Sequence, residues 1–366
     1  MLYPELDTPA LLVDIDIMDA NLRRMQERAD RAGVRLRPHT KTHRTPALAK
    51  RQVSFGARGI TVAKLGEAEA MAAEGLDDIF IANEIVGPHK LERLVKLARR
   101  IRVAVGVDHP AQVAALAQAF AGEAKPLDVL LDIDTGDART GVAPGSPALA
   151  LARAVTESAG LHLRGIFTHE GHSYGAADRD AVRDVVRRSH EDMLATAELL
   201  RKHGIAVDEI SVGATPAMLV ADPLPGITEI RPGTYIFLDA AQAAVIGTLA
   251  HCALTVLATV VNRPTPDRVV LDTGVKALTA FVRGAGVTRN VGHGTLKAWP
   301  QIHIEHLSDE HGVFTAPDGV HFEIGQRVEI IPNHACPTCN LYDRMYGVRG
   351  GRVVEEWPIL ARGKSQ

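Results

Sequence analysis

Short apolar runs alternate with longer amphipathic stretches over residues 34–238. The runs that we expect to be strands cover residues 34–40, 59–64, 78–84, 101–107, 128–134, 163–170, 209–215 and 227–235. Between them lie stretches with apolar residues at helical spacing, such as 65–75 and 90–100. Such a series of strand–helix units predicts an α/β fold, a (β/α)8 barrel of the TIM type rather than an open doubly wound sheet.

The pattern changes after residue 240. Strand-like runs with glycine- and proline-bearing connections cover residues 253–263, 267–273, 301–307, 326–332 and 351–358. An early apolar run at 11–16 precedes the first barrel unit and could return to this second region. We therefore expect a barrel over residues 15–238 and a mainly β domain over 239–366, with 1–14 returning to it.

Composition narrows the class of protein. The chain has 366 residues, of which 46% are hydrophobic and 23% charged, and its formal net charge is −3. These values are typical of a globular protein without a nucleic-acid or membrane-surface role. We expect no signal peptide and no membrane-spanning run. Three cysteines fit a reducing compartment, so we expect a cytoplasmic protein.

Cationic and ionisable side chains cluster at the end of the first expected barrel strand. In an extended strand alternate residues share one face, which would here hold Arg37, His39, Lys41 and His43. So much positive charge should destabilise the ammonium form of Lys41 and make its amine a better nucleophile for a carbonyl. The alternative is a solvated basic patch on a loop.

Two further groups lie at expected strand ends. Arg139, in the segment 134–142, could anchor an anionic oxygen of a cofactor or simply pair with Asp134 or Asp137. Small residues end the last two barrel strands, at 211–215 and 231–235. Barrels of this type often bind phosphate at such places through open backbone N–H groups.

His334 and Cys336 follow the strand-like run at 326–332, and both residue types are good ligands for zinc-like ions. In an extended strand they would face the same way. Cys336 and Cys339 also form a CxxC pair, but no thioredoxin-like context surrounds it. No second CxxC is present for a four-ligand structural zinc. The segment predicts either an open metal site or an inert buried pair.

Four motifs occur in a recognisable order: RPHTKTH at 37–43, GATP at 213–216, RPGTY at 231–235 and PNHACPT at 332–338. Together they resemble the D-serine dehydratase and D-threonine aldolase group of the alanine-racemase-like enzymes, which use pyridoxal phosphate (PLP). The likeness runs from DTPALLVDID at 7–16 to WPILARG at 357–363. It implies a barrel of the alanine racemase type, a β domain that carries metal ligands, and a homodimer.

The resemblance also implies roles for single residues. Lys41 is expected to hold PLP as a Schiff base, and Arg139 to lie near the phenolic oxygen of the cofactor. His334 and Cys336 are expected to bind a divalent metal, with zinc as first choice and manganese or magnesium as alternatives. The other cofactor-binding candidates are His39 and His169, with a phosphate cradle of Gly213, Ala214, Thr215, Gly233 and Tyr235. His172 and Tyr174 join Lys41 as catalytic candidates.

The group contains two reactions. A dehydratase removes the Cα proton, with Lys41 as the natural base, and expels the β-hydroxyl, which leads to a 2-oxo acid and ammonia. An aldolase breaks the Cα–Cβ bond and gives glycine and an aldehyde. In both, the metal would act on the β-hydroxyl as a Lewis acid.

Three features favour the dehydratase. The metal pair is His-x-Cys, as in the dehydratases, whereas the aldolases carry His-x-Asp. THEGHSY at 168–174 resembles the dehydratase pattern T-H-x-G-x-S-Y, and Gly175 stands where the aldolases have an acid–base histidine. SVGATP at 211–216 is closer to the dehydratase SVGSTP. In contrast, PTCNLYD at 337–343 and DTGVK at 272–276 resemble the aldolases.

We therefore expect a lyase that dehydrates a small D-3-hydroxy amino acid, with D-threonine aldolase as the alternative. An amino-acid racemase is a more distant alternative, because a racemase needs no metal pair. D-serine, D-threonine, a 3-hydroxyaspartate and bulkier substrates remain open. His172 departs from both patterns: it could contact a substrate carboxylate, replace the missing acid–base group, or be a hydrogen-bonded pocket residue.

Overall fold

The computed structural model describes residues 2–366. Contacts divide this part of the chain into two compact units. The barrel unit comprises Met25–Lys41, Pro46–Gly233 and Gly363–Gln366, and the β unit comprises the residues up to Arg24, Thr42–Thr45 and Thr234–Arg362. Helix α1 (Ile15–Ala32) contributes to both. The boundary between residues 238 and 239 that the sequence suggests stays a prediction.

Within the described chain, eight parallel strands form the sheet of the barrel unit, in the order β2-β9-β8-β7-β6-β5-β4-β3. They are β2 (Arg35–Leu36), β3 (Ile60–Val62), β4 (Asp78–Glu84), β5 (Arg102–Val107), β6 (Leu127–Asp132), β7 (Leu161–Phe167), β8 (Glu209–Val212) and β9 (Glu229–Ile230). A parallel bridge between His39 and Thr61 joins the chain after β2 to β3, so the ends of the sheet meet. Each predicted run overlaps one of these strands, and the predicted barrel is confirmed.

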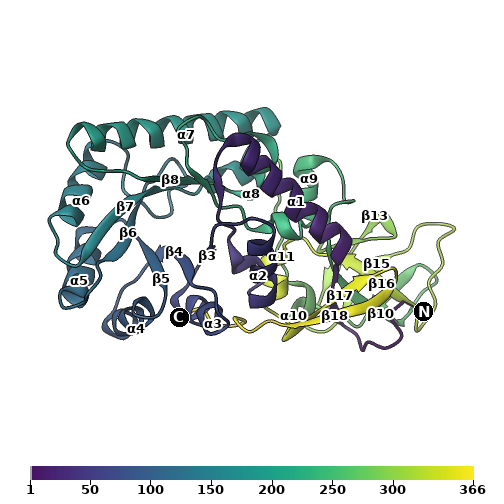
Figure 1. Ribbon diagram of the computed structural model, residues 1–366. Coiled ribbons are helices and arrows are strands. Elements are labelled where there is room, and N and C mark those ends of the chain that lie inside the picture. Colours follow the sequence, from purple (N-terminus) through teal and green to yellow (C-terminus); the bar gives the residue numbers. More distant parts are fainter. Residues whose placement is uncertain (1) are drawn as a thin grey trace. The chain divides into compact units, whose positions relative to one another are not determined.

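Helices surround these strands (Figure 1). They are α2 (Pro46–Ser54), α3 (Leu65–Ala73), α4 (Pro88–Ala98), α5 (Pro110–Phe120), α6 (Ser146–Thr156), α7 (Arg179–Lys202) and the short α8 (Thr215–Val220). The longest, α7, buries Val182, Val186 and Met193 at helical spacing, and the Asp178 carboxylate caps it by accepting the Ala181 N–H at 2.8 Å. Strands covered in this way are buried on both faces, which explains their nearly continuous apolar sequences.

The β unit contains a mixed sheet with the order β13-β12-β16-β10-β1-β17-β18, and β11, β15 and β14 extend it from β10. The strands are β1 (Ala10–Asp14), β10 (Leu254–Asn262), β11 (Arg268–Leu271), β12 (Thr295–Leu296), β13 (Trp299–His303), β14 (His306–Leu307), β15 (Gly312–Thr315), β16 (Arg327–Ile331), β17 (Arg344–Arg349) and β18 (Arg352–Pro358). The sequence reading missed β12, β15 and β17. Short elements complete the unit: the 3-10 turn η3 (Thr234–Ile236) and the helices α9 (Ala240–Ile246), α10 (Val275–Leu278) and α11 (Ala335–Cys339).

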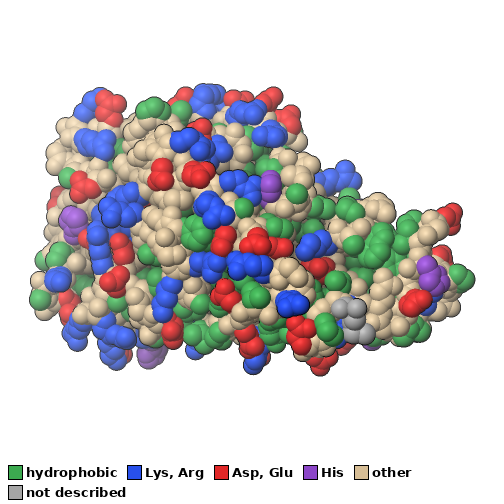
Figure 2. All heavy atoms as spheres, turned by 45° about the vertical axis from the view of Figure 1, so that its right-hand side comes forward, with side chains coloured by type: hydrophobic (Ala, Val, Ile, Leu, Met, Phe, Trp, Pro, Cys, Tyr) green, Lys and Arg blue, Asp and Glu red, His purple; other side chains and the backbone are tan. Residues whose placement is uncertain are grey.

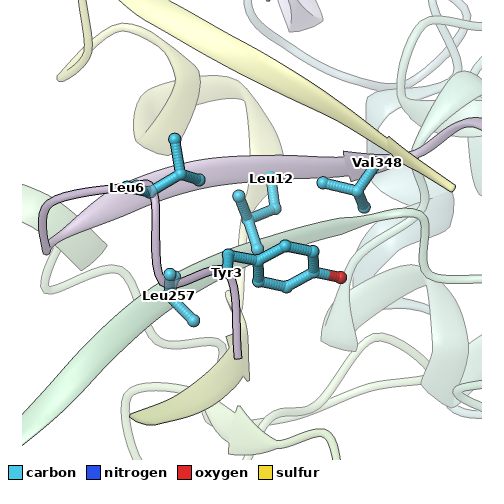
Figure 3. Close-up of a cluster of buried hydrophobic side chains, with 6 residues drawn as sticks. Tyr3, Leu6, Leu12, Leu257 and Val348 are labelled. Atoms are coloured by element: carbon cyan, nitrogen blue, oxygen red, sulfur yellow. The ribbon is translucent and has the colours of Figure 1, made fainter. Parts of the chain in front are cut away.

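The early apolar run does join this sheet, because β1 pairs antiparallel with β10 and parallel with β17. Tyr3, Leu6, Leu12, Leu257 and Val348 converge on one face of these strands and form a buried cluster (Figure 3). Burial of such side chains stabilises the sheet by about 1.5–3 kcal/mol each. The cluster therefore holds the N-terminal segment to strands more than 240 positions away.

The surface has a mixed character. On the face drawn in Figure 2, basic and acidic side chains are interspersed. None of the helices within residues 2–366 combines the length and the apolar character needed to cross a membrane.

Candidate active site

Lys41 lies in the 3-10 turn η1 (Thr40–Thr42), after the C-terminal end of β2. The turn is anchored by Thr40, whose hydroxyl donates to Glu67 Oε1 at 2.8 Å. Glu67 is fully buried, and its other oxygen accepts the Ala63 N–H at 2.9 Å. Two separate loops of the barrel unit therefore share one carboxylate, which fixes the backbone that carries Lys41.

The expectation that Arg37, His39, Lys41 and His43 share one face of an extended strand is wrong. β2 ends at Leu36, and the 3-10 turn breaks the alternation before Lys41. Arg37 turns into the barrel, where its guanidinium contacts Glu229 at 2.8 Å and Asp78 at 2.7 Å. It is a structural residue, and its charge is neutralised by these two carboxylates.

Two uncharged imidazoles lie near Lys41. Burial, together with the charge of Lys41, holds the pKa of His39 well below its usual value, and burial lowers the pKa of His169 to about 3. The Lys41 N–H donates to His39 Nδ1 at 3.4 Å, and His169 Nδ1 donates to the Gly213 carbonyl at 3.4 Å. Both rings are therefore neutral at physiological pH and present aromatic faces without a charge.

The predicted phosphate cradle is built around Gly213. Its φ is +124°, and a Cβ there would lie 2.8 Å from the backbone nitrogen of Arg231, so only glycine fits. Ala214 precedes the first residue of α8, and the hydroxyl of Thr215 accepts the Gly233 N–H at 3.3 Å. These four residues thus form one turn pair at the ends of β8 and β9. Tyr235, two residues further on, is buried in η3 of the β unit.

A buried hydrogen bond that the sequence reading missed supports this cradle. Glu170 and His190 have fully buried side chains, and Glu170 Oε1 lies 3.2 Å from His190 Nε2. The other carboxylate oxygen accepts the Gly213 N–H at 2.9 Å. Burial raises the pKa of Glu170, but the hydrogen bond from His190 lowers it by more, so the pKa lies below its usual value. Glu170 is thus an ionised anchor beneath the glycine turn.

Arg139 lies on the loop between β6 and α6. Its side chain is more than half exposed and lies 3.6 Å from Asp137, so the ion pair forms with Asp137. Hydrogen bonds fix the loop: the Gly136 and Ala138 N–H groups donate to Asp134, and Thr140 donates to Asp132. The charge of Arg139 contributes to the lowered pKa of His39 and His169, which places it on their side of the barrel.

His172 and Tyr174 lie in the 3-10 segment η2 (Gly171–Gly175), after β7. The His172 ring packs against Gly136, where an added Cβ would lie 3.3 Å from Nε2. Its Nδ1 is buried and has no hydrogen-bond partner among the described residues. The Tyr174 ring centroid is 6.3 Å from that of His169. The segment thus gathers both candidates on the side of the barrel that holds His169.

His334 and Cys336 belong to the β unit. The predicted extended geometry is wrong, because β16 ends at Ile331 and Cys336 lies in α11, with His334 as its N-cap. The helix begins there because the buried Asp239 carboxylate accepts the Ala335 N–H at 2.9 Å. Burial lowers the pKa of His334, but its hydrogen bond with Cys336 and the charge of Asp239 outweigh this and raise it. The side chains of His334 and Cys336 are therefore in contact, although the segment is not extended.

Three observations bear on metal binding. His334 Nδ1 is buried without a hydrogen-bond partner in the described part of the chain. The Cys336 thiol lies 3.4 Å from the hydroxyl of Thr42, which directly follows Lys41 in the sequence. Residues 2–366 hold no group of three or more His, Cys, Asp or Glu side chains able to bind a metal. Cys339 is fully buried, and burial raises the pKa of its thiol well above the usual value.

Comparison with known proteins places the chain. The family model of the alanine racemase N-terminal domain matches residues 13–241, and that of the putative serine dehydratase domain matches residues 253–348. The chain belongs to the alanine racemase-like family of PLP-dependent enzymes. The resemblance and the enzyme class predicted from the sequence are confirmed.

Relatives of this family match nearly the whole chain. A D-threonine aldolase of Arthrobacter sp. is 38% identical over 98% of this chain and 94% of its own length. A D-threo-3-hydroxyaspartate dehydratase of Delftia sp. is 34% identical over 97% of both chains. The crystal structure of a D-threonine aldolase from Filomicrobium marinum superposes with a TM-score of 0.89 at 34% identity, covering 98% of this chain and 96% of the other. Aldolases and dehydratases of D-amino acids are therefore both among its relatives.

Proposed function

We propose that the protein is a PLP- and metal-dependent dehydratase of D-3-hydroxy amino acids, with PLP on Lys41 and a divalent metal on His334 and Cys336. The His-x-Cys pair carries this choice. Solved variants of a D-threo-3-hydroxyaspartate dehydratase replace a histidine and a cysteine two positions later, and the cysteine variant is in a metal-free form. This chain has the same two residue types at the same spacing.

The barrel unit fits PLP. Lys41 is the nucleophilic amine. The neutral rings of His39 and His169 would suit contact with the pyridine ring of PLP. The turn of Gly213, Ala214 and Thr215, with Gly233 and Tyr235, would hold the phosphate, because glycine at Gly213 leaves room where a Cβ would intrude. Arg139, on its anchored loop, would meet the phenolic oxygen.

The His334–Cys336 pair fits a metal. The buried Nδ1 of His334 lacks a partner among the described side chains, and a histidine nitrogen with a thiolate sulfur suits zinc. Manganese or magnesium is the alternative. A site with two protein ligands leaves coordination positions for solvent and substrate, which a closed structural zinc site does not.

The side chains then have separate tasks. When bound, PLP draws electrons from the substrate Cα, and the metal polarises the β-hydroxyl. Lys41 takes the Cα proton at Nζ. His172, whose Nδ1 is buried without a partner in the described chain, either orients the substrate carboxylate or exchanges a proton with the leaving hydroxyl. The Tyr174 ring lies tilted beside His169 and would shield that side from water.

D-threonine aldolase is the second candidate. It is supported by the 38% identity to the Arthrobacter enzyme and by the segment 337–343, which resembles the aldolases. Tyr342 of that segment donates from its hydroxyl to the Ala277 carbonyl at 3.0 Å, which is a packing role that does not decide which bond breaks. We also propose a homodimer, on the family resemblance, and a cytoplasmic location, because three cysteines fit a reducing compartment.

A product assay tests the proposal. The purified protein, loaded with PLP and zinc, is incubated with D-serine, D-threonine or D-threo-3-hydroxyaspartate, with their L-enantiomers as controls and with or without a chelator. Ammonia and a 2-oxo acid, lost on chelation and in Lys41→Ala, support the dehydratase. Glycine and an aldehyde instead make the enzyme an aldolase.

A further inference from the structure

A cationic side chain lies beside the proposed metal pair. The ring of Phe281 packs on that of His334, with centroids 4.7 Å apart and an interplanar angle of 57°. The guanidinium carbon of Arg283 lies 5.1 Å from the Phe281 centroid, in a cation–π contact. All three belong to the β unit. Arg283, Phe281 and His334 therefore form one stack, which ends at the proposed metal ligand.

The stack is held rigidly. The Asn290 N–H donates to the Arg283 carbonyl at 3.0 Å, and the Asn290 side chain accepts the Arg283 N–H at 3.3 Å. Asn333, which directly precedes His334, donates from its buried amide to the carbonyls of Phe281 and Gly292 at 3.1 and 2.8 Å. The loop with Arg283 is thus fastened to the metal-binding segment itself, and its position follows that of His334.

The Phe281 ring contacts both the Arg283 guanidinium and the His334 ring. Arginine keeps its charge at every physiological pH and binds carboxylates through two parallel N–H donors. A guanidinium fixed beside a metal pair is therefore suited to an anionic group of a molecule that the metal also holds.

We infer that Arg283 binds a carboxylate on the β-carbon of the substrate, so that the preferred substrate class is the 3-hydroxyaspartates. This rests on the proposed function, in which the metal acts on the β-hydroxyl. The hydroxyl and the β-substituent share one carbon, so a cation beside the hydroxyl-binding pair meets that substituent. The hydrogen of D-serine and the methyl of D-threonine gain nothing from a guanidinium, whereas a carboxylate gains a charged, bidentate contact.

The α-carboxylate is the competing partner, and substrate comparison separates the two. Every amino acid carries an α-carboxylate, so a residue that binds it affects all substrates alike. A residue that binds the β-carboxylate affects only the dicarboxylic substrate. The test compares wild type with Arg283→Met, which removes the charge, and Arg283→Lys, which keeps it without the planar fork. Arg289→Met is the matched control, because Arg289 is an exposed arginine of the same loop.

Two readouts are measured on the loaded enzyme. The first is kcat/KM for D-threo-3-hydroxyaspartate and for D-threonine. Arg283→Met should lower the first value about tenfold to a hundredfold, mainly through KM, and change the second less than about twofold. The second is equilibrium binding of the non-reactive pair D-aspartate and D-2-aminobutyrate, followed by the visible absorbance of the cofactor. In Arg283→Met the affinity for D-aspartate should fall by the same factor, and Arg283→Lys should recover part of it.

An equal loss for both substrates would overturn the inference and assign Arg283 to the α-carboxylate or to the fold. No loss for either substrate, or the same selective loss in Arg289→Met, would also overturn it. If no substrate gives a product, the proposed function fails. The D-aspartate titration then still decides whether Arg283 recognises a β-carboxylate.

Discussion

Replacement of Glu170 by glutamine should destabilise the barrel unit and loosen the turn at Gly213. The carboxylate accepts two hydrogen bonds, from Gly213 at 2.9 Å and from His190 at 3.2 Å, and all of it is buried. Glutamine has one acceptor oxygen, so its amide nitrogen must face one of the two donors. A lost hydrogen bond to a charged group costs about 1.5–3 kcal/mol. Removal of a buried charge offsets part of this, and we expect a net loss of about 2 kcal/mol.

The loss should depend on pH. The folded state lowers the pKa of Glu170, so its contribution to stability is present above the unfolded pKa of about 4.3 and is lost as the pH falls through the folded pKa. The difference between wild type and Glu170→Gln should therefore be largest at neutral pH and shrink in acid. PLP binding should weaken about tenfold, because the displaced turn is the proposed phosphate cradle.

Urea unfolding of the apoprotein and a PLP titration measure both effects. Glu191→Gln is the control, because Glu191 lies on the same helix as His190 but on the solvent side, where it pairs with Arg187 at 3.1 Å. An exposed pair of this kind contributes at most about 0.5 kcal/mol. If Glu170→Gln unfolds at the same urea concentration as Glu191→Gln, the anchoring role of Glu170 is refuted.

Three further changes address the metal, the cradle and the barrel mouth. Cys336→Ala should reduce tightly bound zinc at least about tenfold, measured by elemental analysis of the dialysed protein, because a thiolate ligand is lost. Gly213→Ala should weaken PLP binding at least about tenfold in an absorbance titration, because the added Cβ meets the Arg231 backbone at a φ of +124°. Burial raises the pKa of Asp132 to about 7, so its contribution to stability is full below the unfolded pKa and is lost as the pH rises toward 7. Asp132→Asn should therefore stabilise the apoprotein by roughly 2–4 kcal/mol at pH 8 and have little effect at pH 4 in urea unfolding.

Each of these changes has a matched control. Cys252→Ala alters a buried thiol elsewhere in the β unit, and full zinc retention in Cys336→Ala would contradict the metal assignment. Gly204 has a φ of +78° but open space where a Cβ would lie, so Gly204→Ala is the control for Gly213→Ala. Equal PLP affinities in both glycine variants would refute the assignment of Gly213 to the phosphate cradle. Asp208→Asn alters an exposed carboxylate, and a pH-independent effect at Asp132 would contradict its raised pKa.

The barrel could be predicted from the sequence because its strands are buried on both faces and read as apolar runs between amphipathic helices. The local geometry of the site could not. Thr40 and Glu67 are 27 positions apart, and their hydrogen bond decides that Lys41 lies in a turn and not in a strand. In the same way Asp239, 96 positions before Ala335, starts the helix that follows His334. Local spacing carries no signal for such contacts.

The supporting residues were missed for the same reason. Glu170 was part of a recognised motif, but its partner His190 lies 20 positions away on α7, and neither residue type indicates the other. Phe281 and Arg283 lie in a loop without periodicity, and contacts of Asn333 and of the Phe281 ring link that loop to the proposed metal ligand. A charged residue in an irregular loop reads as solvated surface until the fold shows what it faces.

Covalent trapping of the cofactor tests the central claim most directly. Borohydride reduction fixes PLP to the lysine that carries it, and peptide mass spectrometry of the reduced, digested protein identifies that lysine. We predict one modified peptide with the label on Lys41, and no label in Lys41→Ala treated in the same way. A label on another lysine of the wild-type protein, or a fully loaded protein in which no lysine is labelled, would contradict the account.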